Sequence, residues 1–408
     1  MSLTLSLRHE KYFLFTLAGI QFSHMLDFMI MMPLGPILMD ALDIDAHQFG
    51  LLVASYSFSA AVFSLFSTSF IDRFERKQFM LSILFMFGLA TLACGLAPDY
   101  STLLLARSLA GAFGGILGAL VQTMIGDVIP YARRATANGT VSVAFGVSTV
   151  AGVPLSLWLA NHFQWRAPFI LVFFLTLSCV FLSLRILPEL RHHLNDKRGA
   201  HPFSAMFMVL RDANHLRALF FSAVIIISGF IVIPYITVYA VNNLNVSQHD
   251  IPMVYLCGGT ATLVSSRLIG QWADRRGKVK VYRWVAMAAM LPLLLVTHIH
   301  GVSLSVWIVC TTVFFVLISG RMIPAMTIIT SAAQPNLRGT FMSMNATIQS
   351  LSMGVATTLA GFMITQDSEG RIVGYRDVGY IAVAANLLAI WFVTHIVMHD
   401  RHGPITEP

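Results

Sequence analysis

The sequence is poor in charged residues, and this scarcity excludes a water-soluble fold. Only 11% of the 408 residues are Asp, Glu, Lys or Arg, whereas 56% are hydrophobic. A globular protein in water cannot bury so much apolar surface within itself. A lipid bilayer must therefore solvate a large part of the chain.

Cysteine is also scarce, and motifs for several chemistries are missing. The four cysteines stand far apart within apolar runs, so no close pair indicates a metal or redox site. The sequence has no Gly-rich loop ending in Lys-Ser/Thr for ATP. No spacing of histidines, carboxylates or a nucleophile with its base indicates a catalytic centre. We therefore expect no enzyme activity, metal site or cofactor. The expected energy source is an ion gradient, for which we favour a proton gradient, or the substrate gradient itself.

What the sequence does contain is a series of apolar runs of about 20 residues, the length that crosses roughly 30 Å of hydrocarbon. The first run extends past the apolar region of a signal peptide and shows no cleavage pattern, so we interpret it as a retained span. The predicted fold is all-α and membrane-integral. Its twelve transmembrane helices are expected at 12–34, 49–71, 79–97, 101–127, 137–160, 167–187, 216–241, 252–272, 283–299, 304–330, 341–365 and 378–398.

Lys and Arg are distributed unequally among the loops. With twelve spans, 20 of the 26 basic residues fall in loops or at span ends on one side, three fall on the other side and three lie deeper within spans. Cytoplasmic loops of membrane proteins carry such an excess of positive charge. We therefore expect a multi-pass protein of the cell inner (plasma) membrane with both termini in the cytoplasm. The net charge of +7 reports this topology and not nucleic-acid binding.

The two halves of the chain resemble each other at equivalent loops. Asp72-Arg73 after the second span recurs as Asp274-Arg275 after the eighth, and Arg134 after the fourth recurs as Arg338 after the tenth. Transporters with duplicated halves build their site at the interface between the repeats. The alternative is chance, because any short cytoplasmic loop collects Arg and Asp.

The longest polar stretch divides the chain between its sixth and seventh spans. The predicted domains are an N-terminal six-helix bundle at 1–187, a cytoplasmic linker at 188–215 and a C-terminal six-helix bundle at 216–408.

The loop after the eighth span reads GQWADRRGK from Gly270 to Lys278. It resembles the signature loop of the major facilitator superfamily, in which Gly270, the Asp274-Arg275 pair and Gly277 match the pattern. The copy in the first half keeps Asp72, Arg73 and Arg76, but Thr68 and Glu75 replace its glycines. The resemblance covers nearly the whole chain. It implies two pseudo-symmetric six-helix bundles that rock around a central cavity.

The fifth span contains Gly146, Gly152 and Pro154. This segment is similar to the glycine and proline motif of the twelve-span drug:proton antiporter branch, especially small efflux permeases of the arabinose-efflux type. Small residues allow close helix packing, and a proline permits a bend. Ordinary close packing explains the same residues, so only the resemblance links them to export.

Polar residues inside the first span form a stripe. Gln21, His24 and Asp27 are three apart and share one face of the helix. Arg107 in the fourth span lies at a similar depth, and it falls where the superfamily has a span 4 arginine tied to proton coupling. We expect Asp27 to be the proton site, with Arg107 as its partner and His24 as a possible relay. The alternatives are a static ion pair, or an Asp27 that binds a substrate cation without titrating.

Other intramembrane polar residues are candidates for a substrate cavity, although each could instead bond between helices. Arg321 in the tenth span either attracts an anionic group or extends its charge to the cytoplasmic face. The four-residue spacings put Tyr235 with Tyr239, and Asn345 with Gln349, on one helix face. The predicted cavity residues are Gln21, Gln122, Tyr235, Tyr239, Arg321, Asn345 and Gln349.

A further set of charges lies at the cytoplasmic ends of the spans. These residues either form ion pairs that close the cytoplasmic side and break when it opens, or only determine topology. The predicted gate and signature loops contain Asp72, Arg73, Arg76, Asp127, Arg134, Arg267, Gly270, Asp274, Arg275, Gly277 and Arg338.

The function that these features predict is secondary active transport, as proton-coupled efflux of small hydrophobic or amphipathic solutes by alternating access. The 21 Met and 30 Phe residues suit an adaptable apolar pocket. The first alternative is a proton-coupled uptake symporter for a polar solute, and a remote one is a membrane-embedded enzyme. The expected partners are a small-molecule substrate, protons and the lipid bilayer, and we expect the chain to act as a monomer.

Overall fold

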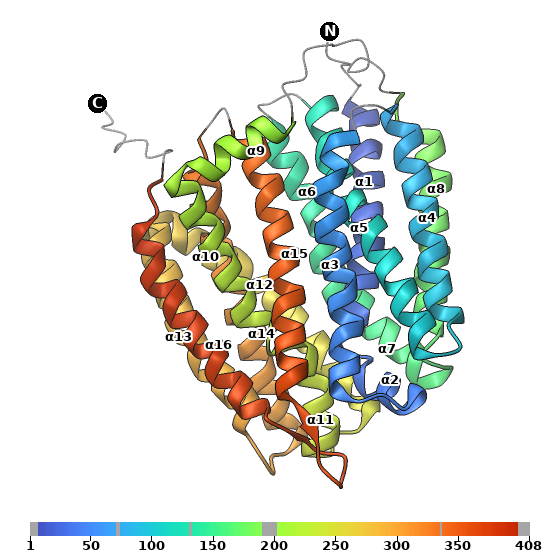
Figure 1. The fold of residues 1–408 in the computed structure, drawn as a ribbon, viewed down its shortest axis with the longest axis vertical. Helices are drawn as coiled ribbons and strands as arrows, with labels where there is room; N and C mark the ends of the chain where they lie inside the picture. The colour runs from blue at the N-terminus through green and yellow to red at the C-terminus, as the bar shows by residue number, and fades with distance from the viewer. Residues whose placement is uncertain (1–6, 71–73, 130–132, 190–201, 335–336, 399–408) are drawn as a thin grey trace.

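The chain folds into a bundle of long, roughly parallel helices (Figure 1). The computed structural model describes residues 7–70, 74–129, 133–189, 202–334 and 337–398. The apolar runs form helices because a helix satisfies its backbone N–H and C=O groups within one segment, as hydrocarbon requires. The first half contains α1 (Leu7–Ile30), α2 (Gly35–Leu42), α3 (Ala46–Phe70), α4 (Arg76–Leu96), α5 (Tyr100–Val128), α6 (Arg134–Val147), α7 (Val153–His162) and α8 (Ala167–Ile186). The second half contains α9 (Pro202–Arg211), α10 (Ala213–Phe230), α11 (Ile236–Leu244), α12 (Ile251–Arg276), α13 (Lys278–His298), α14 (Leu304–Ala332), α15 (Arg338–Met363) and α16 (Tyr375–Phe392).

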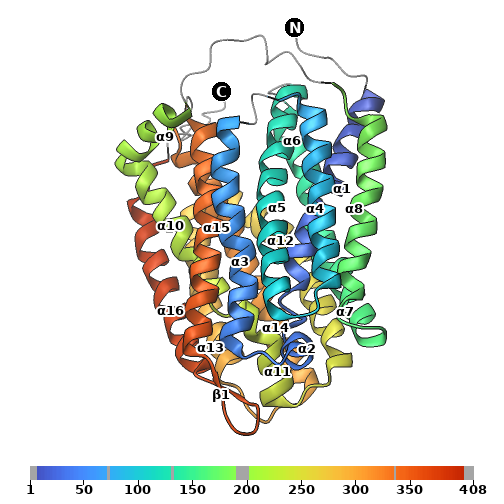
Figure 2. The same cartoon turned by 45° about the vertical axis from the view of Figure 1, so that its right-hand side comes forward.

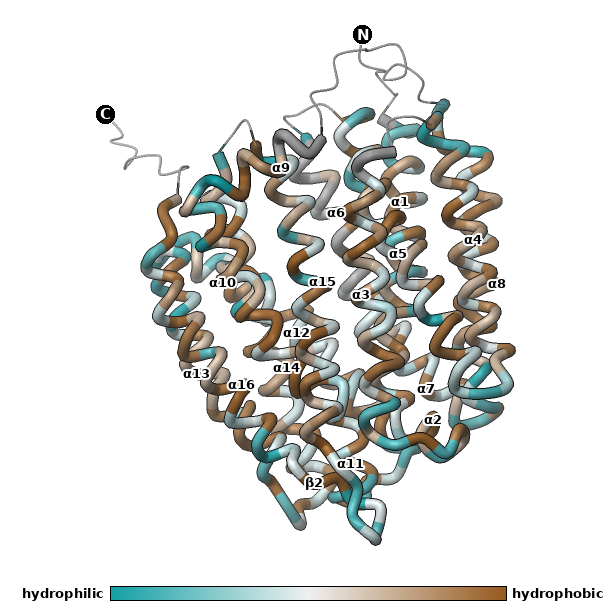
Figure 3. Tube along the Cα trace, in the orientation of Figure 1, coloured by the Kyte–Doolittle hydropathy of each residue, from teal (hydrophilic) through white to brown (hydrophobic). Residues whose placement is uncertain are grey.

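The two ends of the bundle carry different elements. At one end, which we call the terminal face, α1 begins, α16 ends and α9 lies (Figures 1 and 2). The other end, the opposite face, holds α2, α11 and a small antiparallel hairpin of β1 (Thr365–Gln366) and β2 (Ile372–Val373). This hairpin departs from the predicted all-α fold. Hydrophilic residues are concentrated toward the two ends, and apolar residues lie along the helices between them (Figure 3).

Nine helical segments within the described residues are long and apolar enough to cross a membrane. The other three predicted spans correspond to α6 with α7, to α12 and to α15, which lie within the same bundle. A π-helical segment at Ser148–Gly152 separates α6 from α7, and α12 and α15 are rich in polar residues. The multi-pass architecture is therefore established, and the number twelve stays a prediction.

Three large clusters of buried apolar side chains form the core. The cluster nearest the opposite face draws on both halves of the chain. Two further clusters lie nearer the terminal face. The members of one all belong to the first half, between Phe13 and Leu187, and the members of the other all belong to the second half, between Val209 and Ile396. The halves thus share one core at the opposite face and have separate cores toward the terminal face. This pattern favours the predicted division into two bundles, whose boundaries remain a prediction.

Hydrogen bonds also join the two halves at the opposite face. The buried hydroxyl of Tyr235 donates to the backbone oxygen of Ala46 at 3.0 Å. The side-chain amide of Asn161 donates to the backbone oxygen of Gln248 at 2.9 Å. Because these bonds accompany the shared core, the structure represents a state closed at the opposite face.

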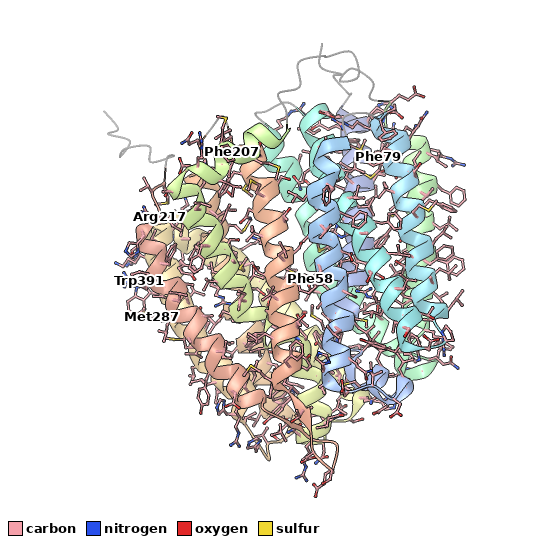
Figure 4. All side chains as sticks on the ribbon, in the orientation of Figure 1. Phe58, Phe79, Phe207, Arg217, Met287 and Trp391 are labelled. Carbon is pink, nitrogen blue, oxygen red and sulfur yellow. The ribbon has the colours of Figure 1, made fainter. Side chains whose placement is uncertain are left out.

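Along the junction of the halves, α3 and α15 lie side by side (Figures 1 and 2). Phe58 of α3 points toward α15 (Figure 4). A Cβ atom at Gly354 would lie 2.8 Å from a carbon of the Phe58 ring. The missing side chain of Gly354 therefore provides the space that this aromatic ring occupies.

Small residues also bring α3 and α5 close together. A Cβ atom at Gly111 would lie 2.3 Å from the backbone oxygen of Tyr56, and one at Gly115 would lie 2.4 Å from that of Ala60. Glycines four residues apart share one helix face and allow backbones in a membrane to approach. This contact holds the α3 backbone at Tyr56 against α5.

Substituting Gly115→Ala should destabilise the protein by about 1–3 kcal/mol, because the added methyl group forces α3 and α5 apart. Gly118→Ala is the matched control, since no atom lies within 4 Å of a Cβ built there. Unfolding of both variants in detergent, followed by tryptophan fluorescence, measures the difference. Equal stability of the two variants would contradict the close-packing argument.

Candidate functional site

A buried ion pair joins α1 to α5. Asp27 and Arg107 are both 0% exposed, and Nη1 of Arg107 lies 2.8 Å from Oδ2 of Asp27. The same nitrogen lies 3.3 Å from the backbone oxygen of Asp27. Pairing offsets the cost of holding either charge in a low-dielectric interior. The structure therefore brings together the acid and the base that the sequence placed at similar depth.

Part of the hydrogen-bonding capacity of the pair is unused. Within the described residues, Oδ1 of Asp27 and both Nε and Nη2 of Arg107 have no hydrogen-bond partner. Buried polar groups are normally satisfied, so such atoms indicate a place where water or a ligand group can bind. Chemically, the pair can accept a proton on the carboxylate or bind a polar group beside it.

Aromatic side chains surround the ion pair. The guanidinium carbon of Arg107 lies 4.7 Å from the centroid of the Tyr56 ring, which is a cation–π geometry. The ring of Phe28 lies 5.4 Å from that of Tyr56 and 6.3 Å from that of Phe230 on α10. A chain of rings therefore connects the ion pair in the first half to the second half. The sequence analysis missed Tyr56, because no pattern marks one tyrosine of an apolar helix as a partner of Arg107.

The other two residues of the polar stripe lie on α1 without bonds to the pair. His24 is 6% exposed, and its Nε2 has no partner among the described residues. Its backbone oxygen accepts a hydrogen bond from the Tyr56 hydroxyl at 3.5 Å. Gln21 is half-buried. A relay through His24 therefore stays a prediction.

The fifth-span motif lies between α1 and the other half of the chain. A Cβ atom at Gly152 would lie 2.7 Å from Leu26 on α1, next to Asp27. One at Gly146 would lie 2.9 Å from Leu263 on α12. Pro154 follows the π-helical segment at the start of α7. Because proline lacks an N–H, it accommodates the irregular backbone there.

Tyr235 and Tyr239 bond to different parts of the opposite face. The span breaks after Phe230 and continues through a 3₁₀ turn at Ile233–Tyr235 that contains Pro234. Tyr235 contacts Ala46 at the junction of the halves. Tyr239, in contrast, bonds to the loop between α13 and α14. The break precedes both tyrosines, so their common face and their place in a substrate cavity stay predictions.

The remaining cavity candidates lie on α5 and α15. Gln122 is exposed. Asn345 is 2% exposed, and its Oδ1 has no partner among the described residues. Gln349 donates through Nε2 to the Ser222 hydroxyl on α10 at 3.1 Å. Gln349 thus bonds between helices of the second half, and the role of the other two residues stays a prediction.

Arg321 does not have the second of its two expected placements, at the membrane surface, and attraction of an anionic group stays a prediction. It is 1% exposed and so does not reach the terminal face. Its Nη1 donates to Oδ1 of Asn386 and, at 3.0 Å, to the hydroxyl of Ser228. Its Nη2 donates to the backbone oxygen of Ile225 at 3.2 Å. Arg321 therefore ties α14 to α10 and α16.

The structure describes some of the predicted gate residues. Nε of Arg76 lies 3.1 Å from Oδ2 of Asp127, which pairs α4 with α5 in the first half. Asp274 lies 3.8 Å from Nζ of Lys278 in the second half. Arg267 and Arg275 are exposed, and Arg338 is half-buried. Asp72, Arg73 and the side chain of Arg134 lie outside the described residues.

The two signature loops differ at the position of their second glycine. Gly277 has a φ of +90°, a conformation that residues with a side chain rarely adopt, and it alone separates α12 from α13. Glu75, which replaces that glycine in the first half, caps α4 instead. Its carboxylate accepts hydrogen bonds from the backbone N–H groups of Lys77 and Gln78 at 3.0 and 2.8 Å. Gly270 is less constrained, since a Cβ there would lie 3.8 Å from Ile323.

Tyr239 belongs to a polar cluster at the opposite face that the sequence analysis missed. Its hydroxyl lies 2.7 Å from the backbone oxygen of Ile299 and 2.8 Å from Nδ1 of His300. Nε2 of His300 faces Arg376, at the start of α16. Because an arginine only donates, His300 must accept through Nε2 and is therefore neutral in this cluster.

Asp27→Leu should destabilise the protein by about 3–5 kcal/mol, because Arg107 keeps its charge and loses its partner. The double variant Asp27→Leu with Arg107→Met should recover most of that loss, since it leaves no buried charge. Unfolding by a titrated denaturing detergent measures both. A double variant as unstable as the single one would show that the pair is not the source of the effect.

The cluster around His300 should make stability depend on pH. Partial burial, Arg376 and His298 lower the pKa of His300 below its ordinary value of 6.5. The unfolded chain therefore takes up a proton first, so the stabilisation is complete above about pH 6.5 and decreases as the pH falls toward the lowered pKa. The loss of melting temperature between about pH 7.5 and 5.5 should be smaller in His300→Gln than in the wild type. His249→Gln, on the same face and exposed, serves as the control, and an equal change in both variants would contradict this assignment.

Comparison with known proteins agrees with the fold described above. A model of the Major Facilitator Superfamily matches residues 17–357. The uncharacterized MFS-type transporter YceJ of Bacillus subtilis is 23% identical over 367 residues, which cover 87% of this chain and 90% of that protein. Multidrug resistance protein 2 of the same species is 24% identical over 370 residues, covering 88% and 90%. A stronger local match, 34% over 134 residues, covers only 25% of the B. subtilis transporter YhcA.

Solved structures of low sequence identity share the fold. A bacterial homolog of the human lysosomal transporter Spinster, in an inward-facing and occupied conformation, superimposes with a TM-score of 0.74 at 16% identity, covering 98% of this chain and 100% of that one. The nucleoside transporter NupG gives a TM-score of 0.75 at 10% identity, covering 95% and 99%. This chain is thus a member of the Major Facilitator Superfamily and a multi-pass membrane transporter of that type.

Proposed function

We propose that this transporter exports small hydrophobic or amphipathic solutes in exchange for protons, with Asp27 as the proton site. The observation that carries the proposal is the fully buried ion pair of Asp27 and Arg107. Ionisable residues within membrane spans are costly and mark ion or proton pathways. In the proposed cycle a proton on Asp27 removes its charge and releases Arg107, and loss of that proton restores the pair.

The position of the pair suits a role in alternating access. Leu26 and Ala106, which flank it, belong to the core that both halves share. Tyr56 and Ala110 belong to the core of the first half alone. The ion pair therefore lies at the boundary between the core that both halves share and the core of the first half alone. A change in its charge is well placed to alter the packing of Phe28 against Phe230 across the junction.

The distribution of basic residues supports a proposal for which side of the membrane is closed in this structure. We infer that the terminal face is cytoplasmic, because basic residues gather on the loops of that side. The structure would then be open to the cytoplasm and closed outside. The gate pair of Arg76 with Asp127 joins α4 to α5 within the first half.

The names of the relatives favour export. One relative is called Multidrug resistance protein 2, and another, from Mannheimia succiniciproducens, is called a probable sugar efflux transporter and is 21% identical over 365 residues. The richness in Met and Phe favours apolar solutes over sugars. A proton-coupled uptake symporter is the alternative in which proton and solute move the same way.

Asp27→Asn should abolish transport driven by a pH gradient, because the amide cannot exchange a proton at this position. The wild type and the variant are reconstituted in liposomes with an acidic lumen, and uptake of a hydrophobic fluorescent cation is followed. The wild type should accumulate the dye, and the variant should lose at least about tenfold of the rate, as expected for loss of an essential proton-transfer group. Asp40→Asn, at an exposed acid of α2 on the opposite face, should transport normally.

Two results would reject this function. Full pH-driven transport by a folded Asp27→Asn protein would exclude Asp27 as the proton site. Dye movement together with protons, out of an acidic lumen, would identify a symporter instead of an antiporter.

A further inference from the structure

The turn between α12 and α13 brings two tryptophans and two cations together at the terminal face. Trp272, Arg276, Lys280, Val281 and Trp284 line a hollow of about 350 Å³. The single residue between the helices makes the reversal tight. The last turn of α12 and the first two turns of α13 can therefore share this hollow.

The spacing within each helix orders these side chains by depth. Trp272 and Arg276 are four residues apart, as are Lys280 and Trp284, so each pair shares one helix face. Since α12 runs toward the terminal face and α13 runs away from it, both tryptophans lie deeper than the cations. Four helical residues span about 6 Å, which is the expected difference in depth.

The two cations are free to bind an anion. Arg276 and Lys280 are exposed, and neither has a hydrogen-bond or ion-pair partner among the described residues. The nearby acid Asp274 is two residues from Arg276, on the other side of α12, and it lies 3.8 Å from Nζ of Lys278. Its charge therefore does not occupy the hollow.

The deeper part of the hollow is apolar. Val281 is 0% exposed and forms its base, whereas Trp272 and Trp284 are 40% and 55% exposed. Tryptophan is enriched at the boundary between hydrocarbon and headgroups. The site thus offers cations at the level of the headgroups and apolar rings one turn below.

We propose that this hollow binds an anionic phospholipid, with its phosphate between Arg276 and Lys280 and its glycerol and upper acyl chains against the two tryptophans. Basic pockets between transmembrane helices recognise acidic headgroups in this way. A free phosphate ion would use the cations but would gain nothing from the rings and Val281. The lipid therefore matches the whole site.

The test compares lipid binding by native mass spectrometry of the full chain in detergent. Purified protein is mixed with equal amounts of phosphatidylglycerol and phosphatidylcholine. The wild type should retain phosphatidylglycerol preferentially, and Arg276→Gln with Lys280→Gln should lower the preference by about fivefold for each charge removed. Arg276→Lys with Lys280→Arg should keep it. The matched control, Arg185→Gln with Arg211→Gln, removes the same charge from exposed positions of α8 and α9 and should leave the preference unchanged.

Several outcomes would overturn the proposal. These are no preference in the wild type, an equal preference in the glutamine variant, an equal loss in the control, and loss of bound lipid when millimolar inorganic phosphate is added. If the glutamine variant does not fold, the wild type alone decides. Raising the salt concentration should then reduce its preference for phosphatidylglycerol, because the attraction is electrostatic, and a salt-independent preference would reject the site.

Discussion

The charge of Arg107 in a low-dielectric interior is the constraint on which the packing of the first half depends. A charge within the hydrocarbon costs about 2.5 kcal/mol or much more, so the guanidinium must find partners from neighbouring helices. Asp27 of α1 supplies the counter-ion, and Tyr56 of α3 supplies an aromatic face. Both must approach α5 closely. Gly111 permits this approach, because any side chain there would collide with the backbone of Tyr56. The buried charge of Arg107 therefore requires the close helix approach that the small residues of α5 permit.

This arrangement also explains why the junction of the halves is sensitive to the ion pair. The residues around the pair include Phe28, whose ring packs toward both Tyr56 and Phe230 of the second half. On the other side of α1, Leu26 fills the space left by Gly152. The π-helical segment that ends at Gly152 also contacts α12, since a Cβ at Gly259 would lie 3.1 Å from Val150. A shift of α1 would therefore change two contacts between the halves, that of Phe28 with Phe230 and that of the π-helical segment with α12.

Hydrophobic periodicity predicted the positions of the long helices and the common depth of Asp27 and Arg107, because both depend only on distance along a helix. It could not predict Tyr56 or the partners of Arg321, since these depend on which helices become neighbours. It also did not predict the break in this span, where a 3₁₀ turn with Pro234 ends at Tyr235, before Tyr239. Periodicity was equally unable to predict the bonding partners of the polar residues on α15. Spacing placed Asn345 and Gln349 together, but only packing shows that Gln349 bonds to Ser222.

The two buried arginines of the corresponding fourth and tenth spans are accommodated in different ways. Arg107 has an acid beside it, so the charge of its surroundings changes whenever that acid gains or loses a proton. Arg321 is held by the neutral oxygens of Ser228, Asn386 and Ile225, which do not titrate in the physiological range. The side-chain amide of Asn386 in turn donates to the backbone oxygen of Ala286 at 2.6 Å, so α13 is joined to the same network. A cation solvated by fixed dipoles keeps its charge and its bonds at every stage of a proton cycle. Under the proposed mechanism the response to protons therefore resides in the first half, at Arg107, whose partner Asp27 can be neutralised.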